Sequence, residues 1–161
     1  MWTGSANNLS GTIQSSLAED FGRQVSATDR KRVLLADDHS AMLEEVRGLL
    51  GNQYEVVGAV PDGGALVEAA QRLQPDLIIS DISMPVMTGF QAAAAIRRSG
   101  IACKLIFLTV QSSPAYLKKA RSLGADGYVL KVYTGEQLAT AVSKVLEGNS
   151  FISPQLKTEW K

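Results

Sequence analysis

The sequence has few cysteines, no excess charge of one sign and no long apolar run, and each absence argues against a class of protein. Its 161 residues include one cysteine, Cys103, which excludes an internal disulfide and which we expect to be a small buried hydrophobe. Sixteen basic and sixteen acidic residues give a formal net charge of 0, which argues against a general electrostatic grip on nucleic acid or on an anionic membrane. There is no secretory leader pattern, and no stretch approaches the ~20 apolar residues of a membrane span. We therefore expect a cytoplasmic protein without direct nucleic-acid or membrane binding.

The composition divides the chain into three parts. Residues 1–32 are rich in Ser, Asn, Gly and Thr and are predicted to be a polar extension. Apolar residues recur every four positions within it, so a short docking helix and a disordered tail both stay open. Residues 33–150 are predicted to form one domain, and residues 151–161 a C-terminal tail or the start of a linker.

Residues 33–150 alternate between short apolar runs and segments with helical periodicity. The runs predict strands at 33–36, 54–60, 77–80, 104–109 and 127–131, and the periodic segments predict helices at 40–50, 63–73, 90–100, 114–124 and 134–149. Ser40 is the expected N-cap and Gly51 the expected C-cap of the first helix, and Thr134 with Gln137 fits a capping box. Five such units predict an α/β fold, a doubly wound five-stranded parallel sheet of order 2-1-3-4-5 like that of flavodoxin.

Polar side chains follow the central strands of this predicted sheet. Asp37 and Asp38 follow the first strand and Asp81 the third, while Thr109 and Lys131 end the fourth and fifth. In such sheets the functional crevice lies beyond the carboxyl ends of the strands. Carboxylates gathered there repel by roughly 3 kcal/mol per pair at an effective dielectric constant of 20. Mg²⁺ and Lys131 would compensate that charge, and Asp81 is a candidate nucleophile toward phosphorus.

Four motifs carry a family resemblance over about three quarters of the chain: "LLADDHS", "IISDISMPVMTGF", "IFLT" and "GYVLK". With them the chain resembles the receiver domain of bacterial two-component response regulators, the CheY-like superfamily, and its NarL/LuxR-type subgroup. The resemblance implies that Asp81 accepts a phosphoryl group from a sensor histidine kinase or phosphotransfer protein. It implies Mg²⁺ as cofactor, with Asp38 as the main direct ligand, Asp37 holding metal-bound water, and Ser83 offering its backbone carbonyl.

The resemblance also implies that the chain is a switch and a binding module. It would not be an enzyme, apart from possible autophosphatase activity. Thr109 would move to bind the phosphoryl group, Lys131 would pair with it, and Tyr128 would turn inward. His39 would merely open the first helix of the domain. Val110 stands where Ala or Gly is usual and is expected to crowd the site.

Several alternatives accompany this interpretation. The ending "FISPQL" resembles the start of a linker, so the chain is either a stand-alone receiver or the N-terminal part of a DNA-binding regulator of the NarL/LuxR type. A pseudo-receiver that takes no phosphate is a further alternative, opposed by the complete set of site residues. A phosphatase with an Asp nucleophile is disfavoured because Ser83 cannot act as its acid and base at neutral pH. Whether phosphorylation produces a homodimer is left open.

Overall fold

The computed structural model describes residues 29–159, and these include a single parallel sheet. Its strands are β1 (Arg32–Ala36), β2 (Glu55–Val60), β3 (Leu77–Ser80), β4 (Lys104–Thr109), β5 (Gly127–Leu130) and β6 (Phe151–Ile152). They are arranged in the order β2-β1-β3-β4-β5-β6, with every adjacent pair parallel. The predicted order of the first five strands is therefore confirmed, and a short sixth strand extends the sheet beyond β5.

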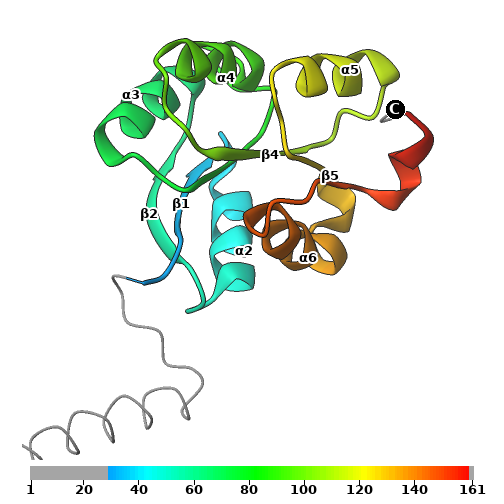
Figure 1. The fold of residues 1–161 in the computed structure, drawn as a ribbon, viewed down its shortest axis with the longest axis horizontal. Coiled ribbons are helices and arrows are strands. Elements are labelled where there is room, and N and C mark those ends of the chain that lie inside the picture. The colour runs from blue at the N-terminus through cyan, green and yellow to red at the C-terminus, as the bar shows by residue number, and fades with distance from the viewer. Residues whose placement is uncertain (1–28, 160–161) are drawn as a thin grey trace, which may run out of the picture. The chain divides into compact units, whose positions relative to one another are not determined.

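Five helices cover the two faces of the sheet. They are α2 (Ser40–Leu50), α3 (Gly63–Leu73), α4 (Gly89–Arg98), α5 (Pro114–Ser122) and α6 (Thr134–Leu146). Figure 1 shows α3, α4 and α5 on one face and α2 and α6 on the other. Each predicted helix is present, with ends that differ from the prediction by a few residues at most.

The strands are apolar throughout because each is covered on both sides. Successive side chains of a strand point to opposite faces, so Leu34 packs in the core beneath α3, α4 and α5, whereas Val33 and Leu35 pack in the core beneath α2 and α6. Both cores are fully buried in the middle of the sheet, where Ile78 and Ile106 are at most 1 % exposed. These two cores hold the strand ends, and with them the site, in fixed positions.

Two of the predicted helix caps are wrong. His39, not Ser40, precedes α2, and no side chain caps that helix. Thr134 is the first residue of α6, and its hydroxyl donates to the Lys131 carbonyl (2.6 Å) instead of forming a capping box. A capping box is present at α4, where the Thr88 hydroxyl and the Gln91 side chain each bind the other residue's backbone amide. The predicted C-cap Gly51 is confirmed, with a left-handed φ of 57°.

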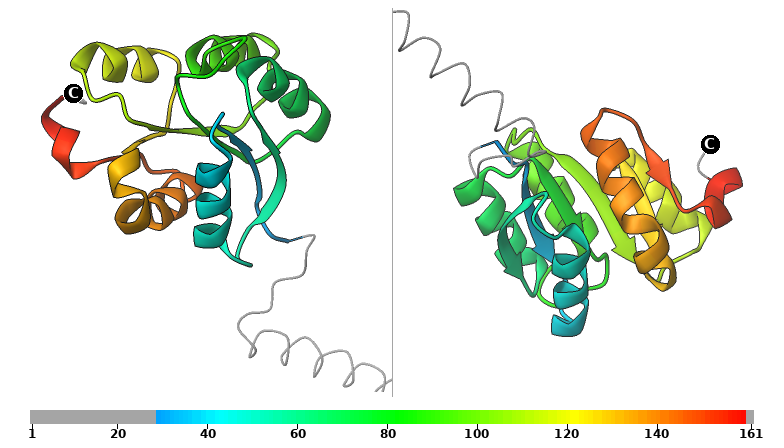
Figure 2. Two further views of the ribbon diagram at one scale, coloured as in Figure 1. Left: turned by 180° about the vertical axis from the view of Figure 1, so that it is seen from behind. Right: turned by 90° about the horizontal axis from the view of Figure 1, so that it is seen from below.

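The segment after residue 150 packs against the domain, although the sequence suggested a tail or linker there. Phe151 and Ile152 pair with Gly127 and Tyr128 of β5, and Leu156 lies in the core with 8 % exposure. Figure 2 shows this C-terminal segment (red) beside α5 and α6. Two strand residues are too few to produce an alternating pattern, so β6 could not be predicted from the sequence.

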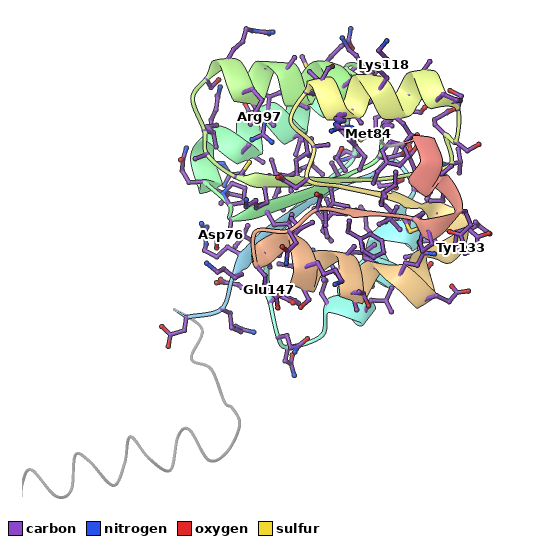
Figure 3. All side chains as sticks on the ribbon, turned by 45° about the vertical axis from the view of Figure 1, so that its right-hand side comes forward. Asp76, Met84, Arg97, Lys118, Tyr133 and Glu147 are labelled. Carbon is purple, nitrogen blue, oxygen red and sulfur yellow. The ribbon has the colours of Figure 1, made fainter. Side chains whose placement is uncertain are left out.

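The two ends of the parallel strands face opposite sides of the domain. Figure 3 shows Asp76, just before β3, on the side opposite to Tyr133, which follows β5. A cavity of about 470 Å³ lies at the amino ends of the strands, where Arg97 and Cys103 contribute to its lining. Burial raises the pKa of the Cys103 thiol, which is half-buried.

Two further sequence-based expectations concern the N-terminal extension and the absence of a membrane span. The predicted polar extension lies outside the described residues as far as residue 28. Within residues 29–159, no helix has the length and apolar character needed to cross a bilayer.

Candidate functional site

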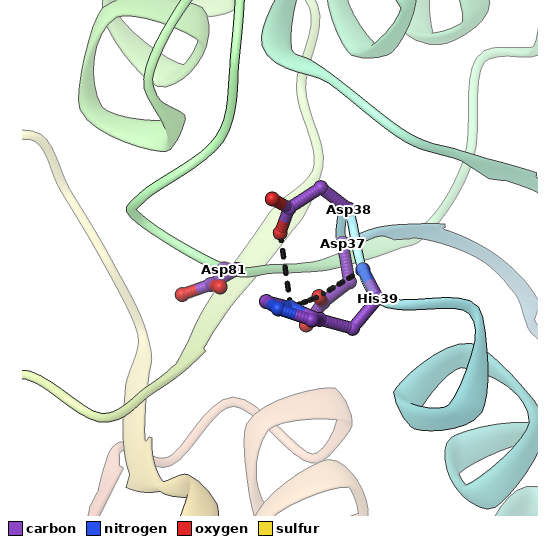
Figure 4. Close-up of side chains that lie close together, drawn as sticks. All are labelled: Asp37, Asp38, His39 and Asp81. Carbon is purple, nitrogen blue, oxygen red and sulfur yellow. Dashed lines mark hydrogen bonds and ion pairs between the residues drawn. The ribbon is translucent and has the colours of Figure 1, made fainter.

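Three carboxylates and an imidazole meet at the carboxyl ends of β1 and β3. Ligand atoms of Asp37, Asp38, His39 and Asp81 all lie within 4.8 Å of one another. Figure 4 shows these four side chains. Asp37 and Asp81 are 3 % and 5 % exposed, because the sheet and its flanking helices enclose the strand ends. Asp38 and His39 are exposed. The structure therefore brings together the three aspartates that the sequence places after the strands, and it adds the imidazole to them.

Lys131 joins the two buried carboxylates. Its ammonium nitrogen Nζ lies 2.8 Å from Oδ2 of Asp37 and 2.9 Å from Oδ2 of Asp81. Burial by itself would lower the pKa of Lys131, but hydrogen bonds to Asp37 and Asp81 outweigh it and raise the pKa above its ordinary value. The ammonium is therefore charged at neutral pH. It offsets part of the negative charge that burial makes unfavourable.

The backbone fixes the position of Asp81. Its amide donates to the Ala36 carbonyl (2.9 Å) across the β1–β3 ladder, and its carboxylate Oδ1 accepts from the Ile82 amide (2.7 Å). Gly89 passes so close that a Cβ at this position would collide with the Asp81 carbonyl oxygen. The glycine at the end of the "DISMPVMTG" loop is thus required by the close approach of two backbones, which explains its place in the motif.

Thr109 and Tyr128 are both fully buried. The resemblance assigns these two residues to a switch. The Thr109 hydroxyl accepts from the Gln111 amide (3.2 Å), and the Tyr128 hydroxyl donates to the Gln111 carbonyl (2.6 Å). Burial first, and the neighbouring Tyr116 and Asp81 next, raise the pKa of Tyr128 well above its usual range. Tyr128 is thus turned inward and is linked to Thr109 through a single residue of the β4–α5 loop.

Two further positions lie at the mouth of the site. The Gln111 side chain donates to the Ser83 hydroxyl at 3.4 Å, so that the loops after β3 and β4 contact each other. Val110 is 69 % exposed beside the fully buried Thr109. The effect of Val110 on the chemistry stays a prediction, as does the carbonyl of Ser83 as a metal ligand.

The donor atoms suit a hard divalent cation. Mg²⁺ prefers carboxylate oxygens and water, and three aspartates supply such oxygens here. Asp37 and Asp81 each turn Oδ2 toward Lys131, and their Oδ1 atoms accept from the amides of His39 and Ile82. The exposed Asp38 can meet an ion that keeps part of its water shell. The residues present therefore fit Mg²⁺.

His39 is the residue of this cluster whose contacts the sequence did not predict. Its amide donates to Oδ1 of Asp37 (2.9 Å), and its Nδ1 lies 3.2 Å from that oxygen and 3.1 Å from Oδ1 of Asp38. The turn after β1 folds the ring back onto the two carboxylates. Its place directly after two aspartates is the signal in the sequence that points to such a contact.

The doubly wound sheet thus gathers buried aspartates, a paired lysine and a buried threonine at the carboxyl ends of its strands. The chain belongs to the response regulator receiver domain family, whose family model matches residues 33–143. It is similar to the transcriptional regulatory protein DesR of Bacillus subtilis, with 36 % identity over 126 residues, covering 77 % of this chain and 62 % of DesR. It is also similar to the chemotaxis protein CheY of Halobacterium salinarum, with 33 % identity, covering 72 % of this chain and 97 % of CheY. The chain thus spans about three fifths of the length of DesR but nearly all of that CheY.

Solved structures agree with this assignment. A two-component response regulator of the LuxR family from Aurantimonas superimposes with a TM-score of 0.76 at 29 % identity, covering 81 % of this chain and 95 % of that one. The isolated receiver domain of RcsB from Salmonella enterica, in the presence of the phosphomimetic BeF₃⁻, gives 0.75 at 28 % identity, covering 82 % and 99 %. The expected family and its NarL/LuxR-type subgroup are confirmed.

Proposed function

We propose that this chain is a receiver switched by phosphorylation of Asp81. The single observation that carries the proposal is the Lys131 ammonium held between Asp37 and Asp81, with Asp38 beside them. Receiver domains are phosphorylated by histidine kinases. The phosphoryl donor proposed here is accordingly a phosphohistidine on a sensor histidine kinase or on a phosphotransfer protein.

The reaction is a displacement at phosphorus. An oxygen of the Asp81 carboxylate forms a bond to phosphorus while the bond from phosphorus to the histidine nitrogen breaks, and the imidazole leaves with a proton. The Asp81 side chain needs no general base, because the carboxylate is the nucleophile. Lys131 already lies 2.9 Å from an Asp81 oxygen and stabilises the added negative charge. Asp37, Asp38, Asp81 and the Ser83 carbonyl would hold Mg²⁺, which when bound would screen the charge of the phosphoryl oxygens as a Lewis acid.

The switch follows from the added charge. The acyl phosphate carries close to −2 where the carboxylate carried −1, so a hydrogen-bond donor nearby gains from turning toward it. Thr109 is such a donor, and Gln111 connects it to Tyr128. A movement of Thr109 would therefore reach Tyr128 and the start of α5, where Pro114 and Ala115 are exposed.

The proposal is tested by intact mass spectrometry after incubation with Mg²⁺ and acetyl phosphate. We expect the parent chain to gain one phosphoryl group that hydroxylamine removes, and Asp81→Asn to gain none. Asp38→Asn serves as the matched metal-site variant and should be phosphorylated only weakly. If the parent gains no mass although calorimetry detects Mg²⁺ binding, the pseudo-receiver alternative replaces this proposal.

The output of the switch is a second proposal. The similarity to DesR over 62 % of that protein supports a receiver that belongs to a transcription regulator, whereas the nearly complete match to CheY is compatible with a stand-alone receiver. We favour the regulator, with a homodimer as the phosphorylated state and the cytoplasm as its location. Light scattering with and without acetyl phosphate tests the dimer: an unchanged mass of the phosphorylated chain would exclude it.

A further inference from the structure

The C-terminal segment, residues 151–156, is attached to β5, the strand that directly precedes Lys131. The Phe151 amide donates to the Asp126 carbonyl (3.1 Å), and the Ser153 amide donates to the Tyr128 carbonyl (2.9 Å). Ile152 and Leu156 are 7 % and 8 % exposed and belong to the core beneath α3, α4 and α5. Residues 151–153 therefore contact β5 from Gly127 to Leu130.

Ser153 continues this contact with its side chain. Pro154 has no amide hydrogen and ends the strand, so the ladder stops at residue 153. The Ser153 hydroxyl takes over at that point: it accepts from the Leu130 amide (3.0 Å) and donates to the Gln137 side chain in α6 (2.6 Å). Ser153 is fully buried, and its hydroxyl satisfies a buried amide that would otherwise have no partner in the sheet.

These contacts reach the site through one peptide group. Leu130, whose amide Ser153 holds, directly precedes Lys131, and the carbonyl of Lys131 accepts from the Thr134 hydroxyl (2.6 Å). The backbone of Lys131 is thus held on its amino side by Ser153 and on its carboxyl side by Thr134, which is 2 % exposed. The Lys131 side chain starts from this fixed backbone and reaches Asp37 and Asp81.

We propose that Ser153 and Thr134 are positioning residues for Lys131, so that docking of residues 151–156 and phosphorylation of Asp81 are coupled. The proposal rests on the proposed function of Asp81. Coupling between two sites is reciprocal. A force or partner that detaches residues 151–156 would lower phosphorylation at Asp81, and phosphorylation would in turn alter the docking of the segment that leads out of the domain.

Two variants of the full chain test the proposal independently. Ser153→Ala removes the hydroxyl on one side of Lys131, and Thr134→Val removes the one on the other side with little change of shape. Ser143→Ala and Thr140→Val are the matched controls, because both residues are exposed and lie in α6. Ser153→Thr keeps a hydroxyl and is the rescue variant.

The first readout is the rate of Asp81 phosphorylation by acetyl phosphate at saturating Mg²⁺. We expect a loss of about tenfold in Ser153→Ala and in Thr134→Val, the lower end of what the loss of a supporting hydrogen bond costs at such a site. The controls and Ser153→Thr should stay close to the parent. Urea unfolding checks that each variant is folded at the assay temperature. If the two hydroxyls only stabilise the fold, the phosphorylation rate of a folded variant should equal that of the parent.

The second readout does not need phosphorylation. Lys131 is only 12 % exposed and paired with two carboxylates, so an acylating reagent should modify it slowly in the parent and several times faster in the two variants. Peptide mass spectrometry measures this rate. Parent-like acylation of Lys131 in both folded variants would overturn the proposal. This readout is independent of the proposed function, because it can be measured even if the parent chain takes no phosphate.

Discussion

Replacement of Lys131 by methionine tests the charge balance of the site most directly. The variant keeps most of the side chain's volume but removes the cation that lies 2.8 and 2.9 Å from two buried carboxylates. Asp37 and Asp81 lie within 4.8 Å of each other, where two unit charges repel by about 3 kcal/mol at an effective dielectric constant of 20. Removing one partner of a buried ion pair costs roughly 3–5 kcal/mol. We therefore expect Lys131→Met to lower the free energy of unfolding by about 3 kcal/mol in the presence of EDTA.

Urea unfolding followed by circular dichroism measures this difference. Excess Mg²⁺ should restore part of the loss, because it supplies a positive charge to the same oxygens, and Asp37→Asn in the same chain should also restore part of it. Lys119→Met is the control: Lys119 is exposed and, within residues 29–159, forms no ion pair. A loss below about 1 kcal/mol in EDTA, the range of surface ion pairs, would refute the argument that Lys131 balances the buried charge.

The same variant has a predictable pH dependence. The pKa of Lys131 is raised in the folded state above its ordinary value of 10.5. A raised pKa means that the stabilisation by the ammonium is fully present below pH 10.5 and is lost as the pH rises through the folded-state pKa. The stability difference between the parent and Lys131→Met should therefore be constant near neutral pH and shrink at strongly alkaline pH.

Three further variants test separate parts of the fold by chemical denaturation. Val86 has a φ of 70° and is 85 % exposed, so Val86→Gly should relieve backbone strain and stabilise the chain by up to about 1 kcal/mol; a destabilised variant would argue against strain there. Thr88→Ala should cost about 1 kcal/mol because α4 loses its cap with Gln91, and no loss would mean that water replaces the cap. Tyr128→Phe should cost about 1 kcal/mol through the lost hydrogen bond to Gln111. Because the pKa of Tyr128 is raised by burial, this variant should also lose less stability than the parent as the pH rises above 10.

The sequence was sufficient to predict the architecture because the two periodicities are clear. Apolar runs of four to six residues, such as Leu77–Ser80, are too short for typical helices and favour strands covered on both faces, and helical spacing fills the intervals between them. The order 2-1-3-4-5 is the common one for five strands, and the gathering of Asp37, Asp81 and Lys131 at one edge follows from the parallel direction of the strands. Local hydrogen bonds were harder to predict: Thr134 and Thr88 are both followed three residues later by glutamine, and only the second forms the capping box.

Contacts made by single side chains across the fold left no pattern in the sequence. Ser153 lies in a segment whose composition suggests a tail, and its burial depends on where β5 ends in space. The contact of His39 with Asp37, by contrast, is local, and the position of His39 directly after two aspartates points to it in the sequence. The resemblance to a family supplied roles for residues at motif positions, and it could not supply the contacts particular to this chain.

The sixth strand also has a consequence for solubility. An unpaired outer strand presents a row of free amides and carbonyls that can recruit another chain. Phe151, Ile152 and Ser153 occupy that row along β5, and Pro154 keeps the new outer strand short. Fragments of this protein that end at residue 150 would leave β5 uncovered with the aromatic Tyr128 in it. They should aggregate more readily than fragments that extend through Leu156.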